Sequence, residues 1–330
     1  MITNQESKTI NSLRFICIVF LVLLHTQVSH LTPSSNKLIV YIQNFSHIPF
    51  LQILFFISGF LFFYNKTDNV TNFKDWLLNI YISKLRKRVK TLLIPYFIWC
   101  VIAILYNTLV KKEPFPHSLE NLVEQFWDTG DGQPIGKAMW YIKSLIVFSL
   151  LSPFYLITIR KMGHLVPIIF LIIHYYNIPI TYPFFNSYIF LGGYIAIFIG
   201  SLNKVFRNFD WRLCLMTAII IKIFEIFYDI PLPFNTIAFF IWIAALWGIL
   251  YKYPVPALVA SSSSFIYFVH PYFTGIRNIY IKLADVNSGI SCTIVWISTA
   301  LTVLLICFGL FILSKKICPK IAGVFVGDRL

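Results

Sequence analysis

Runs of apolar residues recur along almost the whole chain, and most are long enough to cross a membrane. An α-helix needs about 20 apolar residues to span the hydrocarbon layer of a bilayer. The pattern therefore predicts an all-α, polytopic bundle of about ten transmembrane helices, since helices satisfy their own backbone hydrogen bonds in lipid. The fifth range is short and contains a proline, which favours a kinked or re-entrant segment. The expected ranges are 10–31, 48–64, 91–110, 138–160, 164–177, 184–202, 211–228, 233–251, 256–280 and 289–314.

Composition agrees with this pattern. Of 330 residues, 58% are hydrophobic and only 12% are charged, whereas an ordinary soluble domain is about a quarter charged. No soluble domain of useful size fits between the spans, so we expect residues 1–330 to form a single membrane-embedded domain. The net charge is +14, but a nucleic-acid-binding protein presents its positive charge on a soluble basic face. No such face is expected in this chain.

The basic residues instead indicate the orientation of the chain in the bilayer. The segment 66–90 and the C-terminal tail are rich in lysine and arginine, whereas the segment 111–137 is acid-rich. Positive charge accumulates on the cytoplasmic side of membrane proteins, so both termini are expected to be cytoplasmic. The first apolar run follows a polar lead of nine residues without a small-residue cleavage site, which indicates a retained helix rather than a signal peptide.

Two ionisable residues lie in the first span, "RFICIVFLVLLH". Arg14 and His25 are eleven residues apart, which is about three helical turns, so they share one helix face about 16 Å apart along the axis. An arginine within a membrane helix costs roughly 2.5–3.5 kcal/mol on insertion scales, which makes it a functional candidate. A simpler reading has Arg14 reach the lipid headgroups and His25 form a hydrogen bond within the bundle.

A second histidine is expected at the same depth, in "SSSSFIYFVHPYF" near the end of the chain. Ser263, Tyr267 and His270 have i, i+4, i+7 spacing and so line one stripe of a helix. Pro271 would bend that helix just beyond His270. We therefore expect His25 and His270 to face a common cavity, with Tyr267 in its wall, although serines in a span are often simple helix-packing residues.

The segment "WYIKSL" opens another span. Trp140 and Tyr141 fall where aromatic residues gather at the membrane interface, and Lys143 lies deeper, where it needs a partner or water. Glu225 is expected at a comparable depth and could pair with Lys143. It could equally pair with Lys222 at i, i+3, which would leave Lys143 facing a cavity.

Ser58 and Gly59 lie in the middle of "FFISGFLFF". Small residues at this position allow helices to approach closely, and Ser58 is also a candidate for the substrate pocket. Five of the six cysteines fall in predicted spans and the sixth in the tail, with no ligand spacing, so they are interpreted as packing residues and no metal site is expected.

The segment "KLRKRVK" (84–90) carries five basic residues in seven. Lipid attraction and the orientation rule explain much of this density, but the segment is expected on the same membrane side as Arg14. Arginine suits phosphate because of its planar fork of donors. A ligand with nucleotide phosphates, a long flexible arm and a terminal thioester would fit a path from this basic segment towards His25, and an acyl-CoA has that form.

These residues together resemble the integral-membrane acyltransferase family 3, bacterial enzymes that O-acylate surface glycans and related molecules. The resemblance rests on an Arg and a His separated by ten residues in the first helix, on "FFISGFLF", on a basic stretch ending in "LIPYF", on "WYIKSL" and on "SFIYFVHPYF". It covers most of the chain, and the order and spacing of these motifs are more specific than any one of them.

The resemblance implies that His25 is catalytic and that Arg14 engages the acyl-CoA. Basic residues before "IPY" would bind the donor, here Arg86, Arg88 and Lys90. Many relatives carry a second pair of arginines closer to the proline, where this chain has Lys90 and Thr91. Many also have an added extracytoplasmic domain, and none is expected here.

The sequence thus predicts a multi-pass enzyme of the bacterial cytoplasmic membrane that moves an acyl group, most simply acetyl, from cytosolic acyl-CoA to a hydroxyl of a cell-envelope polysaccharide or its lipid-linked precursor. His25 would activate the hydroxyl or relay the acyl group, and no permanently bound cofactor is expected. The alternatives are a transporter or flippase for a glycan intermediate, which would release no CoA, and a non-catalytic scaffold, in which changes at Arg14 and His25 would be silent.

Overall fold

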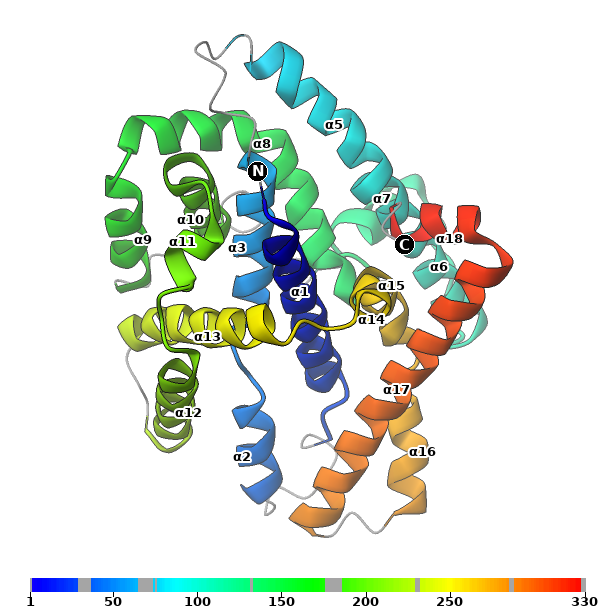
Figure 1. Ribbon diagram of the computed structural model, residues 1–330. Coiled ribbons are helices and arrows are strands. Elements are labelled where there is room, and N and C mark those ends of the chain that lie inside the picture. Colours follow the sequence, from blue (N-terminus) through cyan, green and yellow to red (C-terminus); the bar gives the residue numbers. More distant parts are fainter. Residues whose placement is uncertain are drawn as a thin grey trace. The chain divides into compact units, whose positions relative to one another are not determined.

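The protein is described by a computed structural model, in which residues 2–28, 37–64, 74, 76–130, 133–175, 186–228, 232–284 and 288–327 are described. The described residues form helices joined by short connections, and no β-strand occurs among them (Figure 1). The predicted all-α class is thereby confirmed.

Five helical stretches among the described residues are long and apolar enough to cross a membrane, and two shorter apolar helices accompany them. Several of the expected spans, including 48–64, 91–110 and 138–160, correspond to these stretches. A multi-pass membrane protein follows from them, while the count of ten spans and the cytoplasmic termini stay predictions. The five stretches are Asn4–His25, Lys37–Phe63, Trp76–Leu109, Trp140–Met162 and Gly289–Ile317.

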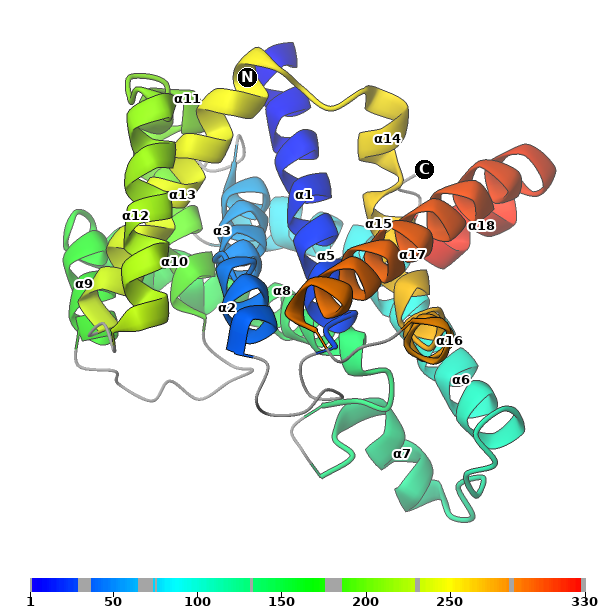
Figure 2. The ribbon, with the colours of Figure 1, turned by 90° about the horizontal axis from the view of Figure 1, so that it is seen from below.

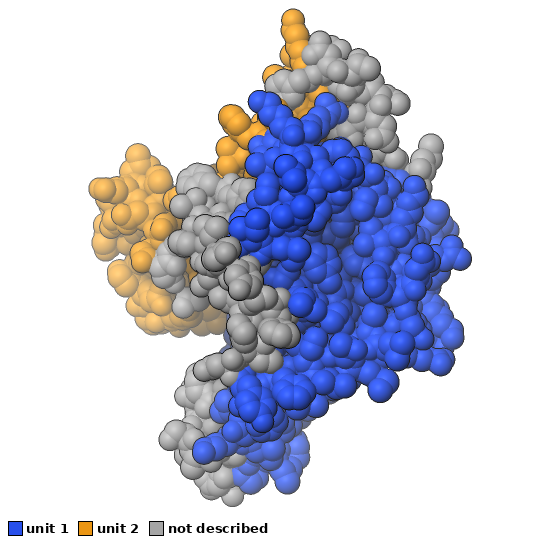
Figure 3. Space-filling view, turned by 90° about the vertical axis from the view of Figure 1, so that its left-hand side faces the viewer, with its two compact units in different colours: residues 1–68, 158–179, 187–310 blue, residues 69–157, 180–186, 311–330 orange. Residues whose placement is uncertain are grey.

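The chain divides into two compact units, which Figure 3 shows in blue and orange. Unit 1 comprises residues 1–68, 158–179 and 187–310. Its helices are α1 (Asn4–His25), α2 (Lys37–Phe45), α3 (Phe50–Phe63), α9 (Leu165–Tyr175), α10 (Ser187–Tyr194, continued by a π-helical turn over Ile195–Ile199), α11 (Leu202–Phe206), α12 (Trp211–Phe227), α13 (Leu232–Lys252), α14 (Ala257–Ser261), α15 (Ser263–Val269) and α16 (Ile276–Leu283).

Unit 2 comprises residues 69–157, 180–186 and 311–330. Two helices, α8 (Trp140–Met162) and α17 (Gly289–Ile317), begin in one unit and end in the other. The helices wholly within unit 2 are α5 (Ile82–Arg88), α6 (Ile94–Leu109), α7 (Leu119–Trp127) and α18 (Pro319–Val326), with π-helical turns over Trp76–Tyr81 and Val89–Leu93 on either side of α5.

Within unit 1, α1 is packed against α3, α13, α14 and α15. Its cytoplasmic end, in the predicted orientation, is fixed by the buried carboxylate of Glu6, which accepts hydrogen bonds from the backbone amides of Leu202 and Asn203 at 2.8 and 3.3 Å. These amides open α11 and would otherwise lack partners, so an acidic group satisfies a helix N-terminus. Figure 2 shows α12 beside α13 in the same unit.

Helices α3 and α10 approach so closely that only glycine fits at two positions. A Cβ atom on Gly59 would lie 2.1 Å from the carbonyl oxygen of Ile189, and one on Gly192 would lie 2.0 Å from that of Phe56. The small residues in "FFISGFLFF" therefore permit helix contact, as the packing interpretation expected. Ser58 donates its hydroxyl hydrogen bond to Leu54 O of its own helix at 2.8 Å.

Among the predicted boundaries that were wrong, two concern the basic segment and the span 256–280. The basic segment 84–90 was expected in a cytoplasmic loop, but it lies in a helical stretch that runs from Trp76 to Leu109. Lysine and arginine are good helix formers, and no glycine or proline interrupts residues 76–94, so the helix extends beyond the apolar run. The expected span 256–280 is instead broken into α14, α15 and α16.

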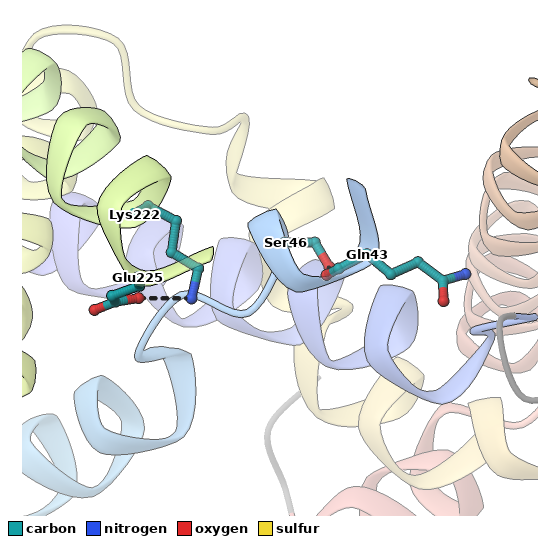
Figure 4. Close-up of polar contacts among 4 residues, drawn as sticks. All are labelled: Gln43, Ser46, Lys222 and Glu225. Atoms are coloured by element: carbon teal, nitrogen blue, oxygen red, sulfur yellow. Dashed lines mark hydrogen bonds and ion pairs between the residues drawn. The ribbon is translucent and has the colours of Figure 1, made fainter. Parts of the chain in front are cut away.

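The structure decides between the two pairings proposed for Glu225. Lys222 Nζ lies 2.8 Å from Glu225 Oε2 on α12, an i, i+3 pair that Figure 4 marks with a dashed line. This pair is largely removed from solvent, and helix α12 contacts α2. The alternative in which Lys222 neutralises Glu225 is confirmed.

Candidate active site

Helix α1 carries both Arg14 and His25, as expected, but it ends earlier than the sequence predicted. It was expected to continue to residue 31, yet His25 is its last residue. The Thr26 hydroxyl donates to Val22 O at 2.9 Å and its backbone amide bonds to the same carbonyl at 3.0 Å. Thr26 is thus the C-cap residue, and His25 lies at the end of α1, where it is half-buried.

His270 lies where the second helix breaks. Helix α15 ends at Val269, and residues His270–Tyr272 form a tight 3₁₀ turn. Pro271 has no backbone N–H, so it cannot make the helical hydrogen bond to Tyr267 O four residues earlier. His270 Nδ1 takes up this acceptor at 2.9 Å and also lies 3.0 Å from Ile266 O. The bend predicted at Pro271 thus orients the histidine next to it.

The two imidazoles lie in direct contact, which is closer than the shared cavity that the sequence predicted, and that cavity stays a prediction. His25 Nδ1 lies 2.8 Å from His270 Nε2, and the rings stack with centroids 5.0 Å apart at an interplanar angle of 23°. His270 is completely buried. We call these two residues the histidine pair.

The partners of the histidine pair assign its tautomers. Carbonyl oxygens only accept hydrogen bonds, so the ring nitrogen of His270 that contacts two of them, Nδ1, must carry a proton. In a neutral ring Nε2 is then an acceptor, and His25 Nδ1 must donate to it. The proton of His25 is held on Nδ1, and His25 Nε2 retains a lone pair. A histidine held in one tautomer by a hydrogen bond to its other nitrogen is suited to general-base catalysis.

Tyr267 lies beside this pair, and two buried serines precede it on α15. The ring of Tyr267 is buried, with its centroid 6.4 Å from that of His270. Ser263 and Ser264 are also buried on α15. Ser263 and Tyr267 of the predicted stripe thus lie on α15, whereas His270 follows in the 3₁₀ turn.

The aromatic and basic candidates of α8 lie in unit 2. Tyr141 is buried and Trp140 half-buried at the start of the helix. Lys143 is only 3% exposed; its Nζ donates to Trp127 O at 2.6 Å and lies 4.7 Å from the centre of the Trp127 ring. Lys143 therefore satisfies the C-terminal end of α7, where a cation is favourable.

Arg14 and the basic segment lie in different units. Arg14 is half-buried in α1, and no carboxylate among the described residues lies within ion-pair distance of it. In the basic segment, Arg86 and Lys90 are exposed and four residues apart, and Arg88 is half-buried. These positions suit anion binding, and the donor contact of each stays a prediction.

Sequence reasoning missed a polar cluster next to the histidine pair. Gln27 lies two residues after His25 in the chain. Its carbonyl oxygen accepts a hydrogen bond from Arg277 Nη1 on α16 at 2.7 Å, and its side chain contacts His47. His47 was left unassigned, and Arg277 fell at the end of a predicted span. The available signal was spacing, because Arg277 follows His270 by seven residues and would share its face in a continuous helix. His30 lies outside the described residues.

The described residues include no group of three or more His, Cys, Asp and Glu side chains placed to share a metal ion.

Comparison with known proteins gives one match. The sequence model of a protein family described as "Acyltransferase domain" matches residues 7–314. Neither the curated proteins nor the solved structures contain a match. The matched range contains Arg14, the basic segment and both members of the histidine pair.

Proposed function

The chain belongs to the acyltransferase 3 family of membrane acyltransferases, and from this premise we propose that it transfers an acyl group from acyl-CoA to a hydroxyl of a cell-envelope glycan. The family match favours an enzyme over a transporter, because it implies transfer chemistry. Acetyl is the simplest acyl group, and the acceptor is a polysaccharide or its lipid-linked precursor. The proposed location is the bacterial cytoplasmic membrane.

The observation that carries the proposal is the hydrogen bond from His25 to His270. It leaves the lone pair of His25 Nε2 available to take the proton of an acceptor hydroxyl. The hydroxyl oxygen attacks the thioester carbonyl, and a tetrahedral oxyanion forms. When the carbon–sulfur bond breaks, the proton on His25 passes to the departing thiolate, so the products are the ester and free CoA. General-base catalysis of this kind contributes about 10²- to 10⁴-fold to a rate.

His270 acts through His25 in this scheme and is a positioning residue. It holds the Nδ1 proton of His25 and stabilises the imidazolium that forms when Nε2 takes the second proton. Its own Nδ1–H is fixed by Tyr267 O and Ile266 O. This is the role that a carboxylate has in a Ser-His-Asp triad.

The donor contacts are assigned to Arg14 and to Arg86, Arg88 and Lys90. A CoA thioester carries phosphates, and guanidinium groups bind phosphate through paired hydrogen bonds. The absence of a described carboxylate partner for Arg14 supports this assignment. Tyr267, Trp140 and Tyr141 are assigned to the acceptor side, as is Ser58.

The proposal is tested by measuring CoA release from acetyl-CoA by the purified protein in lipid nanodiscs, with and without a cell-envelope glycan extract. His25→Ala is compared with wild type. His164→Ala serves as the matched control, because His164 bonds to the Tyr194 hydroxyl at 2.9 Å and belongs to a different part of unit 1.

We expect release in wild type and in His164→Ala that increases with the extract, and a loss of about 10²-fold or more in His25→Ala. Release that survives in His25→Ala would assign catalysis to another residue. If folded wild-type protein releases no CoA with any envelope extract, acyl-CoA is not the donor.

A further inference from the structure

Unit 2 contains a pocket that the proposed chemistry does not use. Its volume is about 410 Å³, within the ~300–1,000 Å³ typical of small-molecule sites. It lies between α6, the segment that follows it, and α7, and we call it the α6–α7 pocket. Its polar lining includes Asn107, Glu113, His117, Asn121, Glu124 and Gln125.

The first wall of the pocket is formed by an unusual turn after α6. Lys112 has φ 62°, the only non-glycine residue with positive φ among the described residues. The backbone amide of Glu113 then bonds to Asn107 O at 3.1 Å. The chain therefore folds back along the last turn of α6, and residues 113–117 face Asn107. A lysine in the left-handed region costs conformational energy that the surrounding bonds must offset.

The second wall is α7. Ser118 caps its N-terminus by accepting a hydrogen bond from the Asn121 amide at 3.1 Å. At the other end, Tyr96 donates to Phe126 O and Lys143 to Trp127 O. Helix α7 is thus capped at one end and held to α6 and α8 at the other, which sets where its backbone presents Asn121 and Glu124 to the pocket.

The lining has the chemistry of a sugar site. Amide and carboxylate groups supply both donors and acceptors for hydroxyl groups, and Phe115, with Ile104 and Ile135, supplies an apolar surface for the C–H face of a ring. No lysine or arginine occurs among the described lining residues, whereas Glu113 and Glu124 both line it. This charge disfavours a phosphate or a uronic acid and favours a neutral or amino sugar.

The outer surface of α7 carries an apolar stripe that suits contact with lipid. Leu119, Val123 and Trp127 form an i, i+4, i+8 stripe and are 77%, 58% and 47% exposed. An amphipathic helix with an apolar stripe and a polar opposite face lies in the interface of a bilayer. Segment 111–137 is predicted to be extracytoplasmic, where the sugars of an envelope glycan or lipid-linked precursor are presented.

We propose that the α6–α7 pocket binds a neutral or amino sugar unit of the acyl acceptor. The inference rests on the proposed function for the identity of the acceptor, but sugar binding itself needs neither acyl donor nor His25. The pocket selects the acceptor, and the histidine pair performs the transfer.

The test measures sugar binding to the full-length protein in nanodiscs without acyl donor, by saturation-transfer NMR. The probes are cellobiose as a neutral sugar, glucosamine as an amino sugar and glucuronate as an acidic sugar. The variants are Glu113→Gln/Glu124→Gln, Asn121→Ala and Phe115→Ala. Glu120→Gln is the matched control, since Glu120 is exposed on the same helix and does not line the pocket.

We expect the wild-type protein to bind cellobiose or glucosamine. Each pocket variant should bind it with an affinity at least about fivefold lower, which is the effect of losing one hydrogen bond or ring contact. Glu120→Gln and His25→Ala should bind as wild type does. The proposal is wrong if no probe binds, if glucuronate binds best, or if the pocket variants bind as tightly as the control. Retained binding in a protein that releases no CoA would separate a failure of the proposed function from a failure of this inference.

Discussion

The histidine pair and the α6–α7 pocket are built in opposite ways. His270 is completely buried, and both of its ring nitrogens have partners, so its orientation is fixed before any substrate binds. The pocket instead has exposed polar side chains on a fixed backbone, with Glu113 and Asn121 open to solvent. Preorganisation suits a group that must hold one proton at one atom, whereas exposed side chains can adapt to a variable glycan.

The proposed roles assign acyl transfer to the histidine pair and sugar recognition to the α6–α7 pocket, so the two should be separable. A change at the histidine pair should lower the rate of transfer and leave sugar binding intact, and a change at the pocket should do the reverse.

The largest effect is expected from His25→Ala, which removes the base. Acyl transfer should fall by about 10²- to 10⁴-fold, while cellobiose or glucosamine binding is unchanged. Steady-state CoA release and saturation-transfer NMR on the same preparation make the measurement. Loss of sugar binding together with activity would mean that the two regions are coupled.

His270→Ala should reduce the rate less, because His25 keeps its lone pair and loses only its orientation. We expect kcat to fall about 10- to 100-fold, comparable to the loss of an outer-shell partner, with little change in the acceptor KM. His270→Gln is the conservative variant, since a glutamine can accept from His25 Nδ1 and donate to Tyr267 O.

Partial recovery of kcat in His270→Gln would distinguish positioning from mere structural support. An equal loss in the two variants, with unchanged thermal stability, would contradict the assignment of tautomers.

The sequence predicted much of this pair. Arg14 and His25 share α1, and Pro271 predicted the bend beside His270. What it could not predict is that His270 Nδ1 bonds to Tyr267 O, because this depends on how the backbone and side chains are arranged at the bend. The additional break at Ser262 has no glycine or proline to signal it.

The pocket was missed for a different reason. Segment 111–137 was interpreted only as acid-rich and extracytoplasmic, although Ser118 is a good N-cap residue. The turn that shapes the wall depends on Lys112 at positive φ, a conformation for which sequence rules expect glycine or asparagine. Hydropathy also began the span 91–110 at residue 91, although the helical stretch starts at Trp76 and includes the basic residues before that position.

Pro271→Ala tests how the backbone orients the pair. Alanine restores an N–H at 271 that can bond to Tyr267 O, in competition with His270 Nδ1. Exchanging one hydrogen bond is worth about 1 kcal/mol, so kcat should fall about fivefold. The control Pro167→Ala changes a proline of α9, away from the pair, and should leave kcat unchanged. An unaltered kcat in Pro271→Ala would show that Ile266 O alone suffices to hold His270.

The smallest effects are expected at Lys112, where two substitutions should have opposite consequences for the pocket. Glycine adopts positive φ readily, so Lys112→Gly should keep the turn, and sugar affinity should change less than about twofold. Valine is strongly disfavoured there, so Lys112→Val should move residues 113–117 and weaken sugar binding about fivefold or more, the equivalent of one lost hydrogen bond. CoA release with a saturating acceptor should be the same in both variants, because neither touches the histidine pair. If Lys112→Val binds sugar as wild type does, the turn after α6 does not shape the site, and recognition must depend on α7 alone.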